Sequence, residues 1–172
     1  GDPRSPEGTA LLRASHDYLS SLYPPEHNHY LSIDALCAPD ITFLLAEAEG
    51  RTTGCVALKA FDGYGEIKSM FVDPAIRGAG TGSALMTALD ALGRELALPL
   101  LRLETCDDLF PPHTLYARPG FTICGPFRAY QPGPPPLFLS KPLCPPRHPL
   151  VTLALASAAA FLRARKSPLP RP

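Results

Sequence analysis

A basic, glycine-rich turn is the part of this 172-residue chain whose residue types point most directly to chemistry. Residues 77–82 read RGAGTG, which places three glycines in six positions. Glycines let successive backbone N–H groups converge on one point, and a helix that follows adds partial positive charge there. Arg77 at the edge of the turn can hold a phosphate through two hydrogen bonds. We therefore predict that this turn binds phosphate.

The sequence around the turn predicts a strand before it and a helix after it. Residues 66–72 alternate, so we expect Ile67 and Phe71 on one face of a strand, and Glu66, Lys68 and Met70 on the other. From residue 83, leucines spaced by three and four predict a helix through residue 96. The alternating glycines do not match the G-x-G-x-x-G spacing of a dinucleotide-binding site. The alternative to phosphate binding is a glycine-rich connection between strand and helix that binds no ligand.

The whole chain predicts a mixed α/β (α+β) domain, mostly antiparallel, with one β-α-β unit over residues 65–105. We expect helices over 9–22, 32–36, 83–96 and 111–118, and strands over 41–47, 54–60, 66–72, 100–105, 121–127 and 136–141. The phosphate-binding turn then lies at the carboxyl end of the first strand of that unit, which is where such units bind ligands.

Composition argues against several classes of partner. Sixteen basic and sixteen acidic residues give a net charge of zero, so we expect no nucleic-acid partner. Five widely spaced cysteines without a C-x-x-C pair argue against a disulfide framework or a zinc site, and favour a reducing compartment. The first ten residues contain no apolar signal-peptide core. We therefore expect a cytoplasmic location and no metal.

Two motifs together resemble the GCN5-related N-acetyltransferase (GNAT) superfamily. RGAGTG at 77–82 is similar to that family's R/Q-x-x-G-x-G/A pyrophosphate loop, and LYARPGF at 115–121 is similar to its L-Y-x-x-x-G-F motif. The resemblance covers residues 11–143. Shorter matches at 22–26, 28–29, 65–68 and 102–105 look like a bacterial-type branch of small, single-domain acetyltransferases.

This resemblance implies direct transfer of an acetyl group from acetyl-CoA to an amine of a small molecule or peptide, in a ternary complex. In such enzymes, the strand backbone pairs with the pantetheine arm and the loop holds the pyrophosphate. The residues that match these two roles are Met70, Phe71 and Val72 for the arm, and Arg77, Gly78, Ala79, Gly80, Thr81, Gly82 and Ser83 for the pyrophosphate.

The resemblance also gives roles to two side chains near the reacting atoms. Tyr116 corresponds to the tyrosine that stabilises or protonates the departing thiolate, and its alternative is a core aromatic residue. An ammonium has no lone pair with which to attack, so a base is needed. Glu66 is the first candidate, acting through a water molecule, and its alternative is a solvated carboxylate paired with Lys68. Glu104 on the neighbouring strand is the second candidate and a substrate contact.

The acceptor side is less clearly marked. Glu26, Asn28 and His29 lie between the first two expected helices, a segment that lines the acceptor pocket in this fold; plain loop residues are the alternative. Two histidines, His27 and His29, do not make a zinc site without a third ligand. Lys68 and Arg102 either contact an acidic group of the substrate or only occupy the strand surface.

Two features depart from the family. Its members usually begin with a strand before the first helix, and residues 1–8 do not supply one, so the first strand is expected to be missing. We expect the domain to span residues 1–143 and residues 144–172 to form a tail. The tail's 13-residue apolar run at 150–162 is shorter than the roughly 20 residues that a membrane span needs, so membrane binding is not expected. We expect a monomer or a homodimer. The alternative function is a non-catalytic sensor that binds acyl-CoA.

Overall fold

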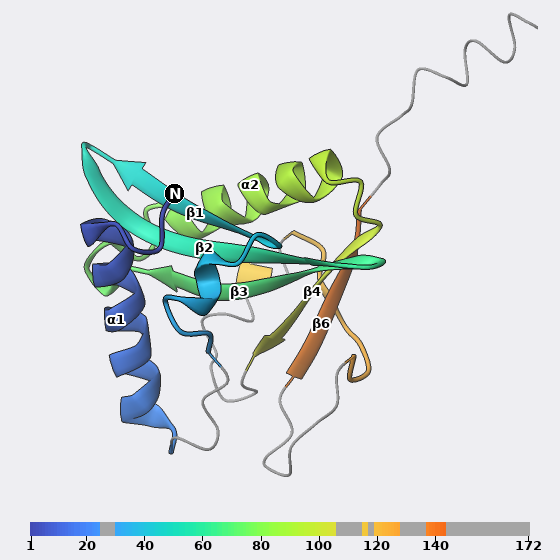
Figure 1. Cartoon of the computed structure of the whole chain (residues 1–172), viewed down its shortest axis with the longest axis horizontal. Helices are drawn as coiled ribbons and strands as arrows, with labels where there is room; N and C mark the ends of the chain where they lie inside the picture. The colour runs from blue at the N-terminus through green and yellow to red at the C-terminus, as the bar shows by residue number, and fades with distance from the viewer. Residues whose placement is uncertain (25–29, 106–114, 117–118, 128–136, 144–172) are drawn as a thin grey trace, which may run out of the picture.

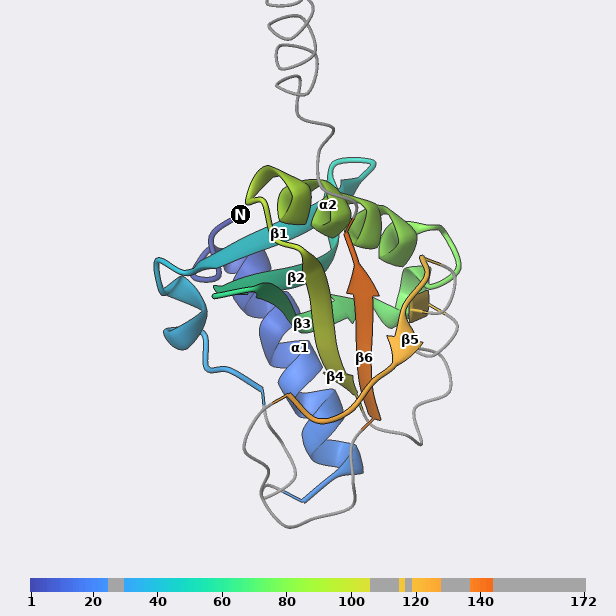
Figure 2. The same cartoon turned by 90° about the vertical axis from the view of Figure 1, so that its right-hand side faces the viewer.

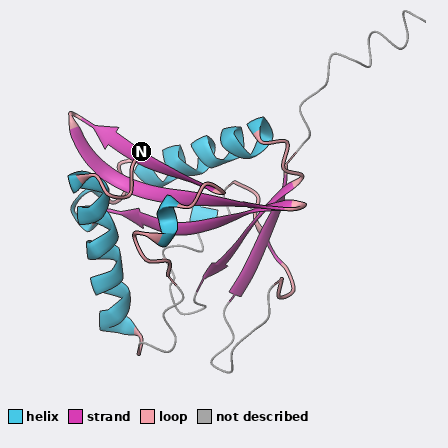
Figure 3. Cartoon of the chain, viewed as in Figure 1, coloured by secondary structure: helices cyan, strands magenta, loops and turns pink. Residues whose placement is uncertain are grey.

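The computed structural model describes residues 1–24, 30–105, 115–116, 119–127 and 137–143. Within them, a six-stranded sheet carries helices on both faces (Figures 1 and 3). The helices are α1 (Pro6–Leu22) and α2 (Thr81–Glu95), with 3-10 turns η2 (Ala35–Cys37) and η3 (Pro74–Ile76). The strands are β1 (Ile41–Ala48), β2 (Arg51–Phe61), β3 (Tyr64–Val72), β4 (Leu100–Thr105), β5 (Thr122–Ile123) and β6 (Leu137–Pro142).

The sheet is mixed and mostly antiparallel, as the sequence predicted. Its strand order is β1-β2-β3-β4-β6-β5, and only the β3–β4 pair is parallel. Helix α2 connects these two parallel strands, so the predicted β-α-β unit is confirmed. The helix expected over 32–36 is only the 3-10 turn η2. Of the helix expected over 111–118, the structure describes a helical turn at residues 115–116.

Each face of the sheet has its own hydrophobic cluster. On one face α2 packs against residues such as Val56, Ile67 and Leu103, and on the other α1 and η2 cover residues such as Phe43 and Cys55. Figure 1 shows the two helices on opposite sides of the sheet, and Figure 2 shows α2 crossing above the strands. Strand β2 is buried on both faces because it lies between these clusters.

Helix α1 differs in detail from the expectation. It begins at Pro6, before the expected start at residue 9, and its N-cap is Ser5, whose hydroxyl accepts a hydrogen bond from the Gly8 N–H at 3.0 Å. Tyr18 and Leu22, near its C-terminal end, are 40% and 46% exposed. Figure 1 gives the reason, since the C-terminal half of α1 extends beyond the sheet and has no strand to pack on.

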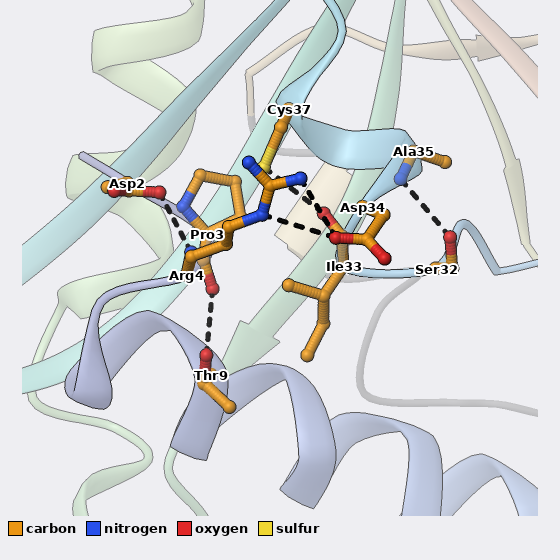
Figure 4. Close-up of polar contacts among 9 residues, drawn as sticks. All are labelled: Asp2, Pro3, Arg4, Thr9, Ser32, Ile33, Asp34, Ala35 and Cys37. Atoms are coloured by element: carbon orange, nitrogen blue, oxygen red, sulfur yellow. Dashed lines mark hydrogen bonds and ion pairs between the residues drawn. The ribbon is translucent and has the colours of Figure 1, made fainter.

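A surface ion pair joins the start of α1 to the segment before β1. The Arg4 guanidinium contacts Asp34 Oδ1 at 2.9 Å, and Figure 4 shows the two side chains facing each other beside η2. The neighbouring turn is closed by the Ala35 N–H, which donates to Ser32 Oγ at 3.1 Å. Both charged side chains are well exposed, so the pair orients the segment and contributes little to stability.

No strand precedes α1 within residues 1–24, in agreement with the expectation for this stretch. The Gly1 ammonium donates to the Phe43 carbonyl at 2.8 Å, so the chain still touches the outer edge of β1. Leu143 is the last described residue of the fold, and the predicted boundary at 143/144 and the tail lie outside what the structure describes. None of the helices in the described ranges is long and apolar enough to cross a membrane.

Helix α2 begins two residues earlier than expected. Gly80 is its N-cap, with φ of +91°, and the helix ends at Glu95, so Leu96 lies beyond it and is 44% exposed. The first turn of α2 lies tight against β2 at Gly54. A Cβ atom there would lie 3.0 Å from Thr81 Cγ2 and 2.9 Å from the Phe71 carbonyl oxygen. Glycine at position 54 therefore sets how closely the glycine-rich turn approaches the sheet.

Candidate active site

Strand β3 contains a bulge that the alternating sequence does not reveal. Cys55 pairs with Phe71 and Ala57 with Lys68, so β3 has one more residue than β2 between these pairs. Ser69 in the bulge has φ of +52°, an unusual value for a residue other than glycine. Because of the bulge, Phe71 packs on the α1 side and Ile67 on the α2 side. The prediction that they share a face is therefore wrong.

The bulge coincides with the separation of β3 from β4. The two strands pair only at Gly65–Leu101 and Glu66–Arg102, and Figure 1 shows their carboxyl ends diverging. Among the described residues, no strand pairs with Met70, Phe71 or Val72 on the β4 side. Their backbone groups on that edge are therefore available to an extended ligand, which is the arrangement needed to bind a pantetheine arm.

The glycine-rich turn presents a group of backbone donors without acceptors. The N–H groups of Gly78, Gly80, Thr81, Gly82 and Ser83 have no hydrogen-bond acceptor among the described residues. Gly78 and Gly80 both have φ of +91°, which only glycine adopts readily, and no atom lies within 4 Å of where their Cβ atoms would be. These donors at the N-terminus of α2 form a cradle suited to an anion.

Arg77 is exposed at the rim of this cradle. Its guanidinium lies 5.7 Å from the centre of the Tyr18 ring, so a cation–π contact connects the turn to α1. Ala79 is also exposed, and its N–H donates to the Ile76 carbonyl at 3.3 Å. The Ala79 amide is therefore engaged within the turn, unlike those of the glycines beside it.

The second motif packs directly against the first. A Cβ atom on Gly82 would lie 3.0 Å from Leu115 Cδ1 and 3.8 Å from Val72 Cγ2. The turn, the end of β3 and the helical turn at 115–116 therefore meet at one place. Tyr116 is buried in the cluster on the α2 face, 6.1 Å from Phe121 between ring centres, and burial raises the pKa of its phenol to about 12.

Glu66 is fully buried on the opposite face of β3. Its Oε1 lies 2.6 Å from Lys68 Nζ, and the Lys68 side chain is only 12% exposed. The pairing between these residues was foreseen, but the carboxylate is not solvated. Its neighbour in the parallel pair is Arg102 on β4. Because Leu101 and Leu103 point into the core, Arg102 and Glu104 lie on the same face as Glu66.

Aromatic rings surround Arg102. Its guanidinium carbon lies 5.0 Å from the centre of the Tyr64 ring and 5.2 Å from that of Phe127. The two rings meet edge to face at 5.8 Å, and Phe127 also packs edge to face on Phe138 at 5.2 Å. This arginine and these aromatic residues, from four separate segments, enclose one end of the Glu66 face.

Some of these residues were not predicted from the sequence, and some of the predicted site residues lie outside the part of the chain that the structure describes. Glu26, Asn28 and His29, with His27, lie outside the described residues. Ser69 was missed because a bulge leaves no mark in a regular apolar pattern, and its buried hydroxyl has no hydrogen-bond partner among the described residues. Tyr64 and Phe127 were missed because only tertiary packing brings them to Arg102.

The comparisons with known proteins give the class. Residues 39–123 match the family model of the acetyltransferase (GNAT) domain. The chain is 42% identical over 135 residues to the IAA acetyltransferase of Azospirillum brasilense, covering 77% of this chain and 88% of that protein. It also resembles a Klebsiella pneumoniae structure described provisionally as an acyl-CoA N-acyltransferase, with 30% identity, a TM-score of 0.69, and coverage of 84% of this chain and 94% of that one.

The chain therefore belongs to the GNAT acetyltransferase family, which makes it an acyltransferase that uses acetyl-CoA as cosubstrate. The same fold is found in the PaiA N-acetyltransferase of Thermoplasma acidophilum in complex with coenzyme A, at 16% identity. That structure has a TM-score of 0.58 and covers 77% of this chain and 89% of its own.

Proposed function

We propose that this protein acetylates the amine of a small molecule or peptide, which attacks acetyl-CoA held between β3 and β4 directly. The observation that supports this most strongly is the open edge of β3 next to the anion cradle. Residues 70–72 would pair with the pantetheine arm, and residues 77–83, with Arg77 at the rim, would hold the pyrophosphate. Acetyl-CoA bound there supplies the acetyl group as a thioester, and the chain's own residues hold and orient it.

In this proposal Glu66 is the base on the α1 side of the sheet. Lys68 Nζ lies 2.6 Å from Glu66 Oε1, and the carboxylate would accept a proton from the acceptor ammonium through a water molecule. Backbone N–H groups of the separated part of β3 would stabilise the oxyanion as the amine adds to the thioester carbonyl. Glu104, on the same face of β4, is the second candidate for the base and a substrate contact.

Tyr116 would act on the thiolate from the α2 side. An exposed thiol has a pKa near 8.5, so a phenol with a pKa of about 12 would not give up its proton to that thiolate. Tyr116 would therefore stabilise the departing thiolate by donating a hydrogen bond from its hydroxyl, and would keep its own proton.

The named relative acts as an IAA acetyltransferase, and the acceptor proposed here remains a small molecule or peptide amine. A cytoplasmic location belongs to the same proposal, supported by the free thiols of Cys37, Cys55 and Cys124. We further propose that the domain ends near residue 143. It would act as a monomer or homodimer, without nucleic acid or a membrane as partner.

The test joins a calorimetric titration with acetyl-CoA to an acetylation assay on a broad panel of amines, followed by mass spectrometry. We expect binding in the micromolar range and one class of amine to gain 42 Da per acetyl group, an approximate mass that follows from replacing N–H with N-acetyl. Binding without any acetylated product would favour a non-catalytic acyl-CoA sensor. Absence of binding would contradict the proposed cofactor site.

A further inference from the structure

We propose that Arg102 binds a carboxylate of the acceptor, so that the preferred acceptors are amines of the amino-acid class. This inference rests on the proposed function and names the substrate class of the same site. It begins from the position of Arg102 directly beside Glu66 in the parallel β3–β4 pair. Neighbouring strands lie about 4.8 Å apart, so the two side chains leave the sheet close together and on one face.

The hydrogen-bonding state of Arg102 is the first support. Among the described residues its guanidinium forms no ion pair and no hydrogen bond, and its Nε is buried without an acceptor. The neighbouring carboxylate of Glu66 is engaged by Lys68 at 2.6 Å. A buried guanidinium nitrogen without an acceptor is unfavourable, which suggests that an anion completes the site.

The aromatic residues around Arg102 are the second support. The Tyr64 and Phe127 rings, at 5.0 and 5.2 Å, stabilise the positive charge and restrict the side chain to one place. Ring faces offer no lone pair in the plane of the guanidinium, so its N–H groups remain available. A planar guanidinium fixed in this way suits a carboxylate, which it can bind through two parallel hydrogen bonds.

The phosphates of acetyl-CoA are excluded as the partner by distance. The cradle at residues 78–83 follows the carboxyl end of β3, whereas Arg102 is beside its beginning. The six residue-to-residue steps from Glu66 to Val72 alone span about 20 Å, at about 3.3 Å per step. A group that contacts Arg102 while an amine reaches Glu66 must therefore belong to the acceptor, with the amine and the carboxylate only a few bonds apart.

The test compares acceptors that differ only in this charge. The protein is given acetyl-CoA with an equimolar mixture of the common free amino acids, or with the same mixture as carboxamides, and acetylated products are quantified by mass spectrometry. We expect at least one amino acid to be favoured over its carboxamide by about 10- to 100-fold in kcat/KM. Arg102→Gln should abolish this preference while leaving acetyl-CoA affinity unchanged, and Arg102→Lys should restore part of it.

Lys59→Gln is the matched control. Lys59 is also a cation on this face, 5.4 Å from the centre of the Phe61 ring, but it is paired with Asp40 at 3.3 Å, so its loss should leave the preference intact. Thermal melting of each variant checks that the fold is retained. If Arg102→Gln no longer folds, the test is whether Arg102→Lys loses part of the preference for amino acids over their carboxamides.

Three outcomes would overturn the inference, and they separate it from the proposed function. Equal use of amino acids and carboxamides, or an equal loss of both in Arg102→Gln, would show that Arg102 does not read a carboxylate. Acetylation of other amines but of no amino acid would also refute it and leave the proposed function standing. Absence of acetyl-CoA binding and of any acetylated product would overturn both.

Discussion

Replacing Gly80 with alanine should separate the role of the cradle from the stability of the fold. Gly80 has φ of +91°, and an L-residue held there costs roughly 1–3 kcal/mol of folding free energy. No atom lies within 4 Å of the added Cβ, so the penalty comes from the backbone and not from a clash inside the protein. For a domain of this size, each 1 kcal/mol lowers the melting temperature by about 2–4 °C.

The effect on acetyl-CoA should exceed this loss of stability. A backbone shift at Gly80 would turn one or two amide donors away from the pyrophosphate, each worth about 1.5–3 kcal/mol as a hydrogen bond to a charged group. The dissociation constant should therefore rise about 10- to 100-fold or more. Calorimetric titration at a temperature at which the variant is fully folded measures this directly.

Gly63→Ala is the matched control for this experiment. Gly63 has φ of +82° and likewise no atom within 4 Å of a Cβ, but it lies in the β2–β3 hairpin at the opposite end of β3. It should destabilise the protein to a similar degree and leave acetyl-CoA affinity unchanged. If Gly80→Ala bound acetyl-CoA as the unmodified protein does, or if both variants lost affinity equally, the cradle assignment would be refuted.

Four further results are expected. Glu66→Gln should lower kcat about 100-fold with little change in the KM for acetyl-CoA, and a kcat within threefold of the original would remove Glu66 as the base. Tyr116→Phe should lower kcat far more than it lowers acetyl-CoA affinity. The factor by which kcat falls should stay constant from pH 7 to about 10, because the phenol, with a pKa of about 12, remains protonated. If the difference in kcat vanished near pH 9, this role would be contradicted. Burial raises the pKa of the Cys55 thiol from 9.0 and that of the Tyr116 phenol from 10.0, both to about 12. The stability linked to their protonated forms is therefore complete below about pH 9 and is lost as the pH rises towards 12. Urea unfolding between pH 8 and 11 should show the free energy of unfolding falling by several kcal/mol, less steeply in Cys55→Ala, and an identical slope in that variant would count against the thiol's contribution. Asp90→Asn leaves the half-buried Lys141 ammonium without its carboxylate and should lower the free energy of unfolding by about 1–3 kcal/mol, whereas a loss under about 0.5 kcal/mol would show that the pair is not stabilising.

The sequence by itself was enough to predict the glycine-rich turn between a strand and a helix, the β-α-β unit around it and the family. These features are local, because glycine spacing, leucine periodicity and the two motifs each lie within one short segment. The register of the strands next to the turn was not accessible in the same way. A bulge at Ser69 reversed the face of Phe71, since one extra residue in a strand moves every later side chain to the other side.

Tertiary structure decided which side chains lie beside Glu66. Lys68 and Arg102 were ambiguous in the sequence, because a charged residue on a strand is as often a surface residue as a ligand contact. Packing separated them, since Lys68 pairs with Glu66 while Tyr64 and Phe127 hold Arg102. These rings come from segments more than sixty residues apart in the chain, and only the folded sheet brings them together. The cradle is thus encoded locally, whereas the proposed carboxylate site is a product of the fold.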